Sequence, residues 1–206
     1  MKLTYAICVC TEARELQSLL SFLTKVKEPE DDINILVDTK HVTPQVHQVL
    51  GAFKDSIVQF SRDFGGDFSA HRNYQLSKCT GDYIFTIDAD EIPQEALIKN
   101  IRKIINETDG DLFLVPRINI CPGYTVEWLK ERSFVINDFG WINWPDYQGR
   151  IYKNVPTIKY GNKLHEQIVG TTRPVRLDAN PQIALWHIKT VEKQDLQDAL
   201  YKDIQP

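Results

Sequence analysis

Three carboxylates follow directly on an apolar run near the middle of the chain. Residues 83–87 are Tyr-Ile-Phe-Thr-Ile, which predicts a buried strand, and Asp88, Asp90 and Glu91 come at its end. Ligands of open α/β sheets bind at the carboxyl ends of the strands. Asp88 and Asp90 point the same way in an extended segment, so their like charges favour a cation between them. Carboxylates on so short a segment suit Mg²⁺ or Mn²⁺, which also take oxygens from a bound phosphate.

The Asp-x-Asp pattern alone is a weak signal, because a chain with this many aspartates contains about one such triplet by chance. A second triplet, residues 109–111, has Gly110 at its centre and polar residues before it, as is typical of a surface turn. Only the first triplet follows an apolar run. This context makes residues 88–90 the leading candidate site.

The elements that must position this site alternate between strands and helices. We expect strands at 3–10, 33–37 and 56–60, separated by a leucine-rich amphipathic helix at 16–23 and a helix at 45–50. Such alternation predicts a mostly parallel central sheet flanked by helices, in a single α/β domain. The later elements that we expect are a helix at 68–79, a helix opened by Pro93, a strand within 111–120, short strands at 150–153, 157–160, 166–169 and 183–187, and a helix capped by Thr190.

Composition narrows the function classes. A net charge of −4 gives no general attraction to nucleic acid, and no apolar run approaches the roughly 18 to 20 residues of a membrane span. The four cysteines lack a Cys-x-x-Cys spacing, so we expect reduced thiols rather than disulfides. These features predict a cytoplasmic protein that does not bind nucleic acid and has no transmembrane segment. They leave open whether the protein binds peripherally to a membrane.

Aromatic residues gather in a loop-rich stretch after the predicted site. Residues 121–148 contain Trp128, Trp141 and Trp144. Indole rings beside a polar site can stack on a sugar ring, so Trp141 and Trp144 are candidates for acceptor binding. The alternative is that these rings close a small core.

Arg72 and two histidines are further candidates for ligand binding. Arg72 lies on the helix before the acidic strand, where a guanidinium would match the oxygens of a diphosphate; a surface ion pair is the alternative. His165 and His187 are candidate metal ligands beside Asp88 and Asp90, although a histidine in a strand is more often a core residue.

Four short segments together resemble the family-two glycosyltransferases of the GT-A fold, especially small bacterial enzymes of the lipopolysaccharide-core type. They are residues 66–73, 81–83, 88–91 and the Leu-His-Glu-Gln of 164–167. The resemblance runs from the first strand to about His187. It implies a GT-A domain over residues 1–206, with a nucleotide-sugar half at 1–110 and a smaller mixed β/loop acceptor half at 111–206.

The resemblance also implies a role for individual residues. The donor would be a nucleoside-diphosphate sugar, expected to be a UDP-sugar, and the protein would contact its base, its ribose and its diphosphate. The implied residues are Thr11, Glu12 and Arg14 along the nucleotide, Asp38 at the base, Arg72 at the diphosphate, Asp88 near the ribose and metal, and Asp90 on the metal.

Glycosyl transfer from such a donor needs a stabilised leaving group and a deprotonated acceptor hydroxyl. A divalent ion held by carboxylates, Mn²⁺ or Mg²⁺, would supply the first as a Lewis acid. A carboxylate on the opposite side of the sugar would supply the second, with Glu166 as first choice and Asp146 as second, and a single displacement inverts the anomeric centre. The expected acceptor is a glycan or a lipid-linked saccharide.

Two other functions compete with glycosyl transfer. A sugar nucleotidyltransferase would need a glycine-rich basic loop after the first strand, which residues 11–14 do not provide. A non-catalytic nucleotide-sugar-binding module would keep the fold without turnover. The presence of Asp88, Asp90 and Glu166 favours the enzyme.

Overall fold

A computed structural model describes the backbone of residues 1–204 and the side chains of residues 1–199. In its first half, strands and helices alternate as the sequence predicts. These elements are β1 (Leu3–Val9), α1 (Ala13–Val26), β2 (Asp32–Asp38), α2 (Pro44–Ala52), β3 (Val58–Arg62), α3 (Phe68–Leu76) and β4 (Tyr83–Asp88).

Within the described residues, the second half contains strands of 3 to 12 residues and three α-helices. Its elements are β5 (Glu91–Pro93), α4 (Glu95–Thr108), β6 (Leu112–Ile120), α5 (Val126–Glu131), β7 (Ile142–Lys153), β8 (Lys159–Gly161), β9 (Gln167–Val169), β10 (Pro174–Arg176), a 3₁₀ turn (Pro181–Ile183), β11 (Leu185–Ile188) and α6 (Val191–Ile204).

One mixed sheet crosses both halves. Within residues 1–204, nine strands pair in the order β3-β2-β1-β4-β7-β6-β11-β5, with β10 beside β6. Strands β3, β2, β1 and β4 are parallel, whereas β7 is antiparallel to both β4 and β6. The predicted α/β domain with a largely parallel sheet is therefore confirmed. The register places Cys8 beside Asp88, so β1 and β4 end together at the acidic site.

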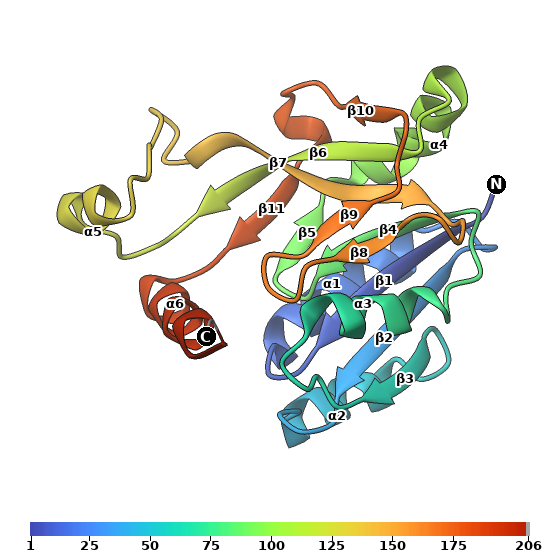
Figure 1. Ribbon diagram of the computed structural model, residues 1–206, viewed down its shortest axis with the longest axis horizontal. Coiled ribbons are helices and arrows are strands. Elements are labelled where there is room, and N and C mark those ends of the chain that lie inside the picture. The colour runs from blue at the N-terminus through green and yellow to red at the C-terminus, as the bar shows by residue number, and fades with distance from the viewer. Residues whose placement is uncertain (205–206) are drawn as a thin grey trace.

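Helices cover the two faces of this sheet unequally. The largest core cluster joins α1, α2 and α4 to one face, and the leucines of α1 predicted to face the core are buried there. A smaller cluster on the other face packs the β8–β9 hairpin and the end of α3 against β1, β4 and β7. Figure 1 shows α5 and α6 beyond the ends of β6 and β11, away from these layers.

Two predicted elements differ from the structure in ways that matter for the site. The strand expected at 150–153 is the end of the twelve-residue β7, whose polar first part hides its strand character in the sequence. Pro93 does not open a helix, because it lies in β5 and α4 begins at Glu95. The turn before β5 consequently carries Ala89 and Asp90 out of the sheet, and Glu91 back into it.

Two expectations from composition can be compared with the structure. All four cysteines are free thiols, as predicted. Over the described part of the chain, no helix has the length and apolar character needed to cross a membrane.

Candidate active site

Asp88 lies between two largely buried arginines at the end of β4. Arg72 of α3 contacts its Oδ1, and Nη2 of Arg150, from β7, lies 2.5 Å from its Oδ2. Asp67 positions Arg72 by capping α3, since its Oδ1 accepts the Ala70 N–H at 2.8 Å. Burial opposes ionisation of Asp88, but Arg150 and Arg72 hold the pKa of its carboxyl well below the usual value. Asp88 is therefore an anion in the protein.

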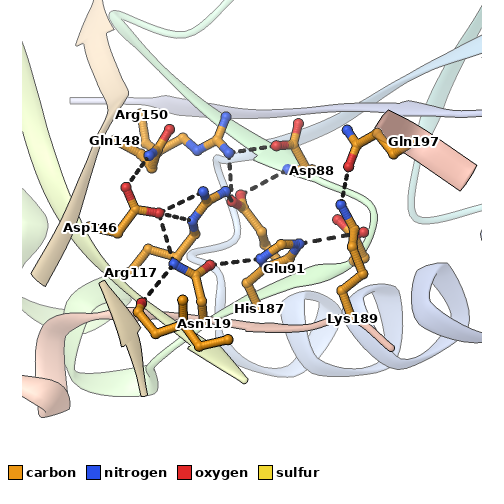
Figure 2. A network of polar contacts seen from close by, with 12 residues as sticks. Asp88, Glu91, Arg117, Asn119, Asp146, Gln148, Arg150, His187, Lys189 and Gln197 are labelled. Carbon is orange, nitrogen blue, oxygen red and sulfur yellow. Dashed lines mark hydrogen bonds and ion pairs between the residues drawn. The ribbon is translucent and has the colours of Figure 1, made fainter. Parts of the chain in front are cut away.

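Glu91 is the buried centre of this cluster. Its side chain is 0% exposed, and its Oε1 lies 2.9 Å from Nη1 of Arg117 and 2.5 Å from Nη2 of Arg150. Its Oε2 accepts the backbone N–H of Asp88 at 3.1 Å. Glu91 thus ties the turn that carries Asp88 and Asp90 to β6 and β7 (Figure 2).

Arg117 extends the network to Asp146, the second candidate for the base. Its Nε and Nη2 lie 2.9 and 2.6 Å from Oδ2 of Asp146. The amide of Asn119 donates to the same oxygen at 2.9 Å, and Gln148 donates to Oδ1 at 2.8 Å. Burial acts to raise the pKa of Asp146, but Arg117 and these amides leave it lowered. Both oxygens of Asp146 are engaged by the protein itself.

Asn119 fixes the orientation of His187, which the sequence made a candidate metal ligand. Because the Asn119 amide nitrogen donates to a carboxylate, its Oδ1 is the atom that faces Nδ1 of His187, at 2.8 Å. Nδ1 therefore carries a hydrogen, and in neutral His187 the Nε2 atom has the lone pair. Nε2 faces Asp90, 3.6 Å from its Oδ2.

Asp90 also contacts the carboxy-terminal helix. Nζ of Lys193 lies 3.4 Å from Oδ2 of Asp90 and 3.3 Å from Oε1 of Glu15, on α1. Burial acts to raise the pKa of Asp90, but the charges of protonated His187 and of Lys193 hold it well below its usual value. Asp90, the second aspartate of the triplet, is therefore also ionised. It lies where β11, α6 and α1 meet.

Glu166, the first candidate for the base, lies on the other side of Arg72. Its Oε1 is 3.7 Å from Nε of Arg72, and its side chain is 20% exposed. It precedes β9 in a hairpin that α3 holds through Asn73, which bonds both backbone groups of Tyr160 at 2.8 Å. His165 next to it is exposed with a left-handed φ of 53°. The structure thus brings Glu166 to the arginine–aspartate cluster.

The predicted nucleotide residues at the end of β1 have different surroundings. Oε2 of Glu12 accepts the backbone N–H groups of Cys10 and Thr11 at 3.1 and 2.9 Å, so Glu12 shapes the turn. Thr11 is exposed at the same strand end. Arg14 is exposed and lines a shallow groove between α1 and α2 with Gln45 and Val49.

Asp38, the candidate for base recognition, is buried and organises the end of β2. Its Oδ1 accepts the backbone N–H groups of Lys40 and Phe64 at 3.1 and 3.2 Å, and its Oδ2 lies 2.6 Å from Nδ1 of His41. Burial acts to raise the pKa of Asp38, but His41 and these N–H groups leave it lowered. The more exposed His41 thus stands beside the residue expected to read the base.

The aromatic stretch forms a connected surface next to Asp146. The rings of Phe139 and Trp141 stack with centroids 5.0 Å apart, and Trp141 meets Trp144 edge-on at 5.2 Å. Trp141 and Trp144 are half-buried, and Phe139 is 76% exposed. Trp128 has a different role, because it belongs to a separate cluster between α5 and β7.

Three residues of the cluster escape the sequence reasoning as site residues. Glu91 stands in the acidic triplet, but its direction into the core depends on β5, which the sequence does not reveal. Arg150 and Arg117 lie on strands where a single arginine has no local signal. The pairing of β7 between β4 and β6 brings both to the end of β4.

Asp90 and His187 supply one oxygen and one nitrogen suited to a divalent ion, but they form no complete metal site. Within the described residues, no group of three or more His, Cys, Asp or Glu side chains could hold a metal. Asp88 is turned towards its arginines, and His165 is exposed on the hairpin. A metal held here would need oxygens from a bound ligand, as is usual for Mg²⁺ with phosphates.

Comparison with known proteins identifies the family. The profile of Glycosyl transferase family 2 matches residues 4–170, so the chain belongs to this family. No sequence among curated proteins matches it significantly.

Solved structures share the fold. S. aureus TarS 1-349 in complex with UDP-GlcNAc superposes with a TM-score of 0.65 at 16% identity, covering 92% of this chain and 59% of TarS 1-349. TarS 1-349 in complex with UDP gives 0.65 at 15% identity, covering 99% of this chain and 65% of that one. For TarS itself the values are 0.64 and 17%, over 97% of this chain and 38% of TarS. The chain therefore spans less than two thirds of these structures.

Proposed function

We propose that this protein transfers a sugar from a nucleoside-diphosphate donor, a UDP-sugar, to a hydroxyl of a saccharide acceptor. One observation carries the proposal: Arg72 stands beside Asp88 at the end of β4 with its buried Nη1 lacking a hydrogen-bond partner among the described residues. A buried guanidinium N–H without a partner is costly, and a phosphate oxygen would satisfy it. Family membership and the UDP and UDP-GlcNAc complexes of TarS support this reading.

We propose Asp90 and His187 as the protein ligands of a divalent ion. The Asn119 contact leaves Nε2 of His187 with its lone pair towards Asp90, the arrangement that a ligating imidazole needs. The ion would act as a Lewis acid that stabilises the leaving diphosphate. Arg72 and Arg150 keep Asp88 ionised and fixed, which leaves Asp88 to contact the donor ribose.

Glu166 is the proposed base. A base must accept a proton in the transition state, and Asp146 is poorly suited because four donors already stabilise its anionic form. Among the described side chains, Glu166 forms one ion pair, to Arg72 at 3.7 Å, and it is partly open to solvent. One displacement with this base would invert the anomeric centre. Trp141 and Trp144 supply the apolar surface for the acceptor sugar.

The direct test is a panel of nucleotide sugars. Thermal shift with UDP-, GDP- and dTDP-sugars, each with Mn²⁺ or chelator, should show stabilisation by UDP-sugars that depends on the metal. Release of UDP in the presence of a saccharide acceptor should follow for the sugar that stabilises best. Binding of a UDP-sugar without release of UDP, whichever acceptor is added, would favour the non-catalytic binding module. Release of pyrophosphate from UTP and a sugar phosphate would instead identify a nucleotidyltransferase.

A further inference from the structure

Two lysines that follow β11 lie beside the acidic turn. Lys193 on α6 contacts Asp90 and Glu15, as described above. Lys189, directly after β11, is half-buried and contacts the Gln197 amide, a neutral partner (Figure 2). Among the residues whose side chains the structure describes, Lys189 forms no ion pair.

A half-buried ammonium group without a counter-ion is unfavourable, so a bound anion would explain why Lys189 lies at this position. Lys189 is held in place by Gln197, one helical turn beyond Lys193 on the same helix. Lys193 contacts Asp90 from α6, and Arg72 and Arg150 contact Asp88, two residues earlier in the same turn. An anion bound at this turn would therefore find cationic groups near both aspartates.

The attachment of α6 is mainly polar where it meets α5. Arg132 lies 2.5 Å from Asp195 and 3.2 Å from Asp198, and the indole N–H of Trp128 donates to Asp195 at 3.0 Å. Leu196, on the same helix, is 72% exposed. Among the described side chains of α6, these polar contacts help to fix the helix in the position that brings Lys193 to Asp90.

We propose that Lys189 and Lys193 bind the diphosphate of the donor, so that α6 forms one wall of the donor site. This inference rests on the proposed function and adds two substrate-binding residues to it. Ammonium groups bind phosphate oxygens as point charges. In this arrangement Lys193 exchanges part of its contact with Asp90 for the donor, and Lys189 gains the counter-ion that it lacks among the described side chains.

The test is calorimetric titration of the whole protein with UDP and with uridine, in the presence of Mn²⁺. Lys189→Met is the cleaner variant, because it leaves no carboxylate without its partner. We expect it to weaken UDP binding about 10- to 100-fold and to leave uridine binding unchanged. Lys99→Met, on the exposed face of α4, is the matched control and should change neither affinity.

Lys193 needs a second variant, because Lys193→Met alone leaves Asp90 and Glu15 to repel the diphosphate. In the double variant Glu15→Gln with Lys193→Met the local charge balance is kept. A loss of UDP affinity that persists in the double variant, and that Lys193→Arg largely avoids, supports a direct contact. Wild-type affinity for UDP in both Lys189→Met and the double variant would overturn the proposal while leaving the proposed function intact.

An increase of UDP affinity in Lys193→Met would also overturn it, because Lys193 would then be an internal counter-ion that competes with the ligand. Failure of the unmodified protein to bind either UDP or uridine has a different meaning. It would reject the proposed function itself, and this inference with it. Far-ultraviolet circular dichroism and melting temperatures of each variant establish that the fold is kept.

Discussion

Arg117 directs two N–H groups at a single oxygen of Asp146, with Nε at 2.9 Å and Nη2 at 2.6 Å from Oδ2. The same guanidinium donates to Glu91 at 2.9 Å. Asp146 and the buried end of the acidic turn are therefore held by one cation. This relationship makes Asp146 part of the framework that positions the site, and it reduces the tendency of its carboxylate to accept a proton.

The two candidate bases should respond differently to amide substitution. Glu166→Gln keeps the shape but removes the proton acceptor, so we expect UDP release in the presence of acceptor to fall about 10²- to 10⁴-fold with UDP affinity unchanged. Asp146→Asn should cost far less. Initial rates and calorimetric affinities measure both effects. Near wild-type turnover in Glu166→Gln, together with a large loss in Asp146→Asn, would reverse the assignment.

Glu91 should matter for stability more than any exposed carboxylate. In Glu91→Gln, Arg150 and Arg117 lose the buried charge that balances them, and breaking a buried ion pair costs about 3 to 5 kcal/mol. Urea unfolding measures this loss of unfolding free energy. The control is Glu95→Gln, which removes an exposed pair with Lys99 and should cost less than about 1 kcal/mol. Equal stability of the two variants would contradict the role of Glu91 as the centre of the network.

Hydrophobic periodicity predicts the first half of the fold well, because the pattern that specifies each helix or strand lies within that one segment. The leucines of α1 and the apolar run of β4 each carry their pattern within one segment, and each forms the element expected. The turn at residues 109–111 also follows its sequence: Asp109 has a left-handed φ of 50°, and Asp111 accepts the backbone N–H groups of Thr172 and Arg173 at 2.7 and 2.9 Å.

The rest of the site depends on pairing between distant segments, which local patterns do not encode. β7 begins with polar residues and inserts between β4 and β6, and only this pairing brings Arg150 to Asp88. The alternative of a surface ion pair for Arg72 is wrong, because its side chain is 11% exposed and its ion pair is with Asp88 at the end of β4. Sequence reasoning found the carboxylates of the site and Arg72, but not Arg150 and Arg117.

His71 should make stability depend on pH. Burial, and then the charge of Arg72, lowers the pKa of His71 to about 4, below its usual 6.5. Between these values the unfolded chain binds more protons than the folded one, so the free energy of unfolding falls as the pH decreases from 7 towards 4. At pH 5 the loss from this group should be roughly 1 to 2 kcal/mol.

Urea unfolding at pH 7.5 and 5 measures this effect. The variant His71→Phe keeps an aromatic ring against Phe64 but cannot titrate, so the difference between the two pH values should shrink by that amount. His47→Asn, on the exposed side of α2, should leave it unchanged. An unchanged difference in His71→Phe would show that other groups cause the pH dependence.

Arg72 should discriminate between a nucleoside and its diphosphate. Arg72→Met removes the charge and the unpartnered Nη1, so UDP affinity should fall about 10- to 100-fold while uridine affinity changes little. Calorimetry with both ligands provides the comparison. A parallel loss for uridine and UDP would place Arg72 away from the phosphates.

The central claim, that the end of β4 binds a nucleoside diphosphate together with a divalent ion, is tested most directly by one set of UDP titrations. UDP is titrated into the protein and into Asp90→Asn, each with Mn²⁺ and with chelator. We predict that chelator weakens UDP binding to the unmodified protein at least about tenfold, because ionised Asp88 and Asp90 then repel the diphosphate. Asp90→Asn should bind with nearly the same affinity with Mn²⁺ as with chelator. Equal affinity in all four titrations, or no UDP binding by the unmodified protein, would contradict the account.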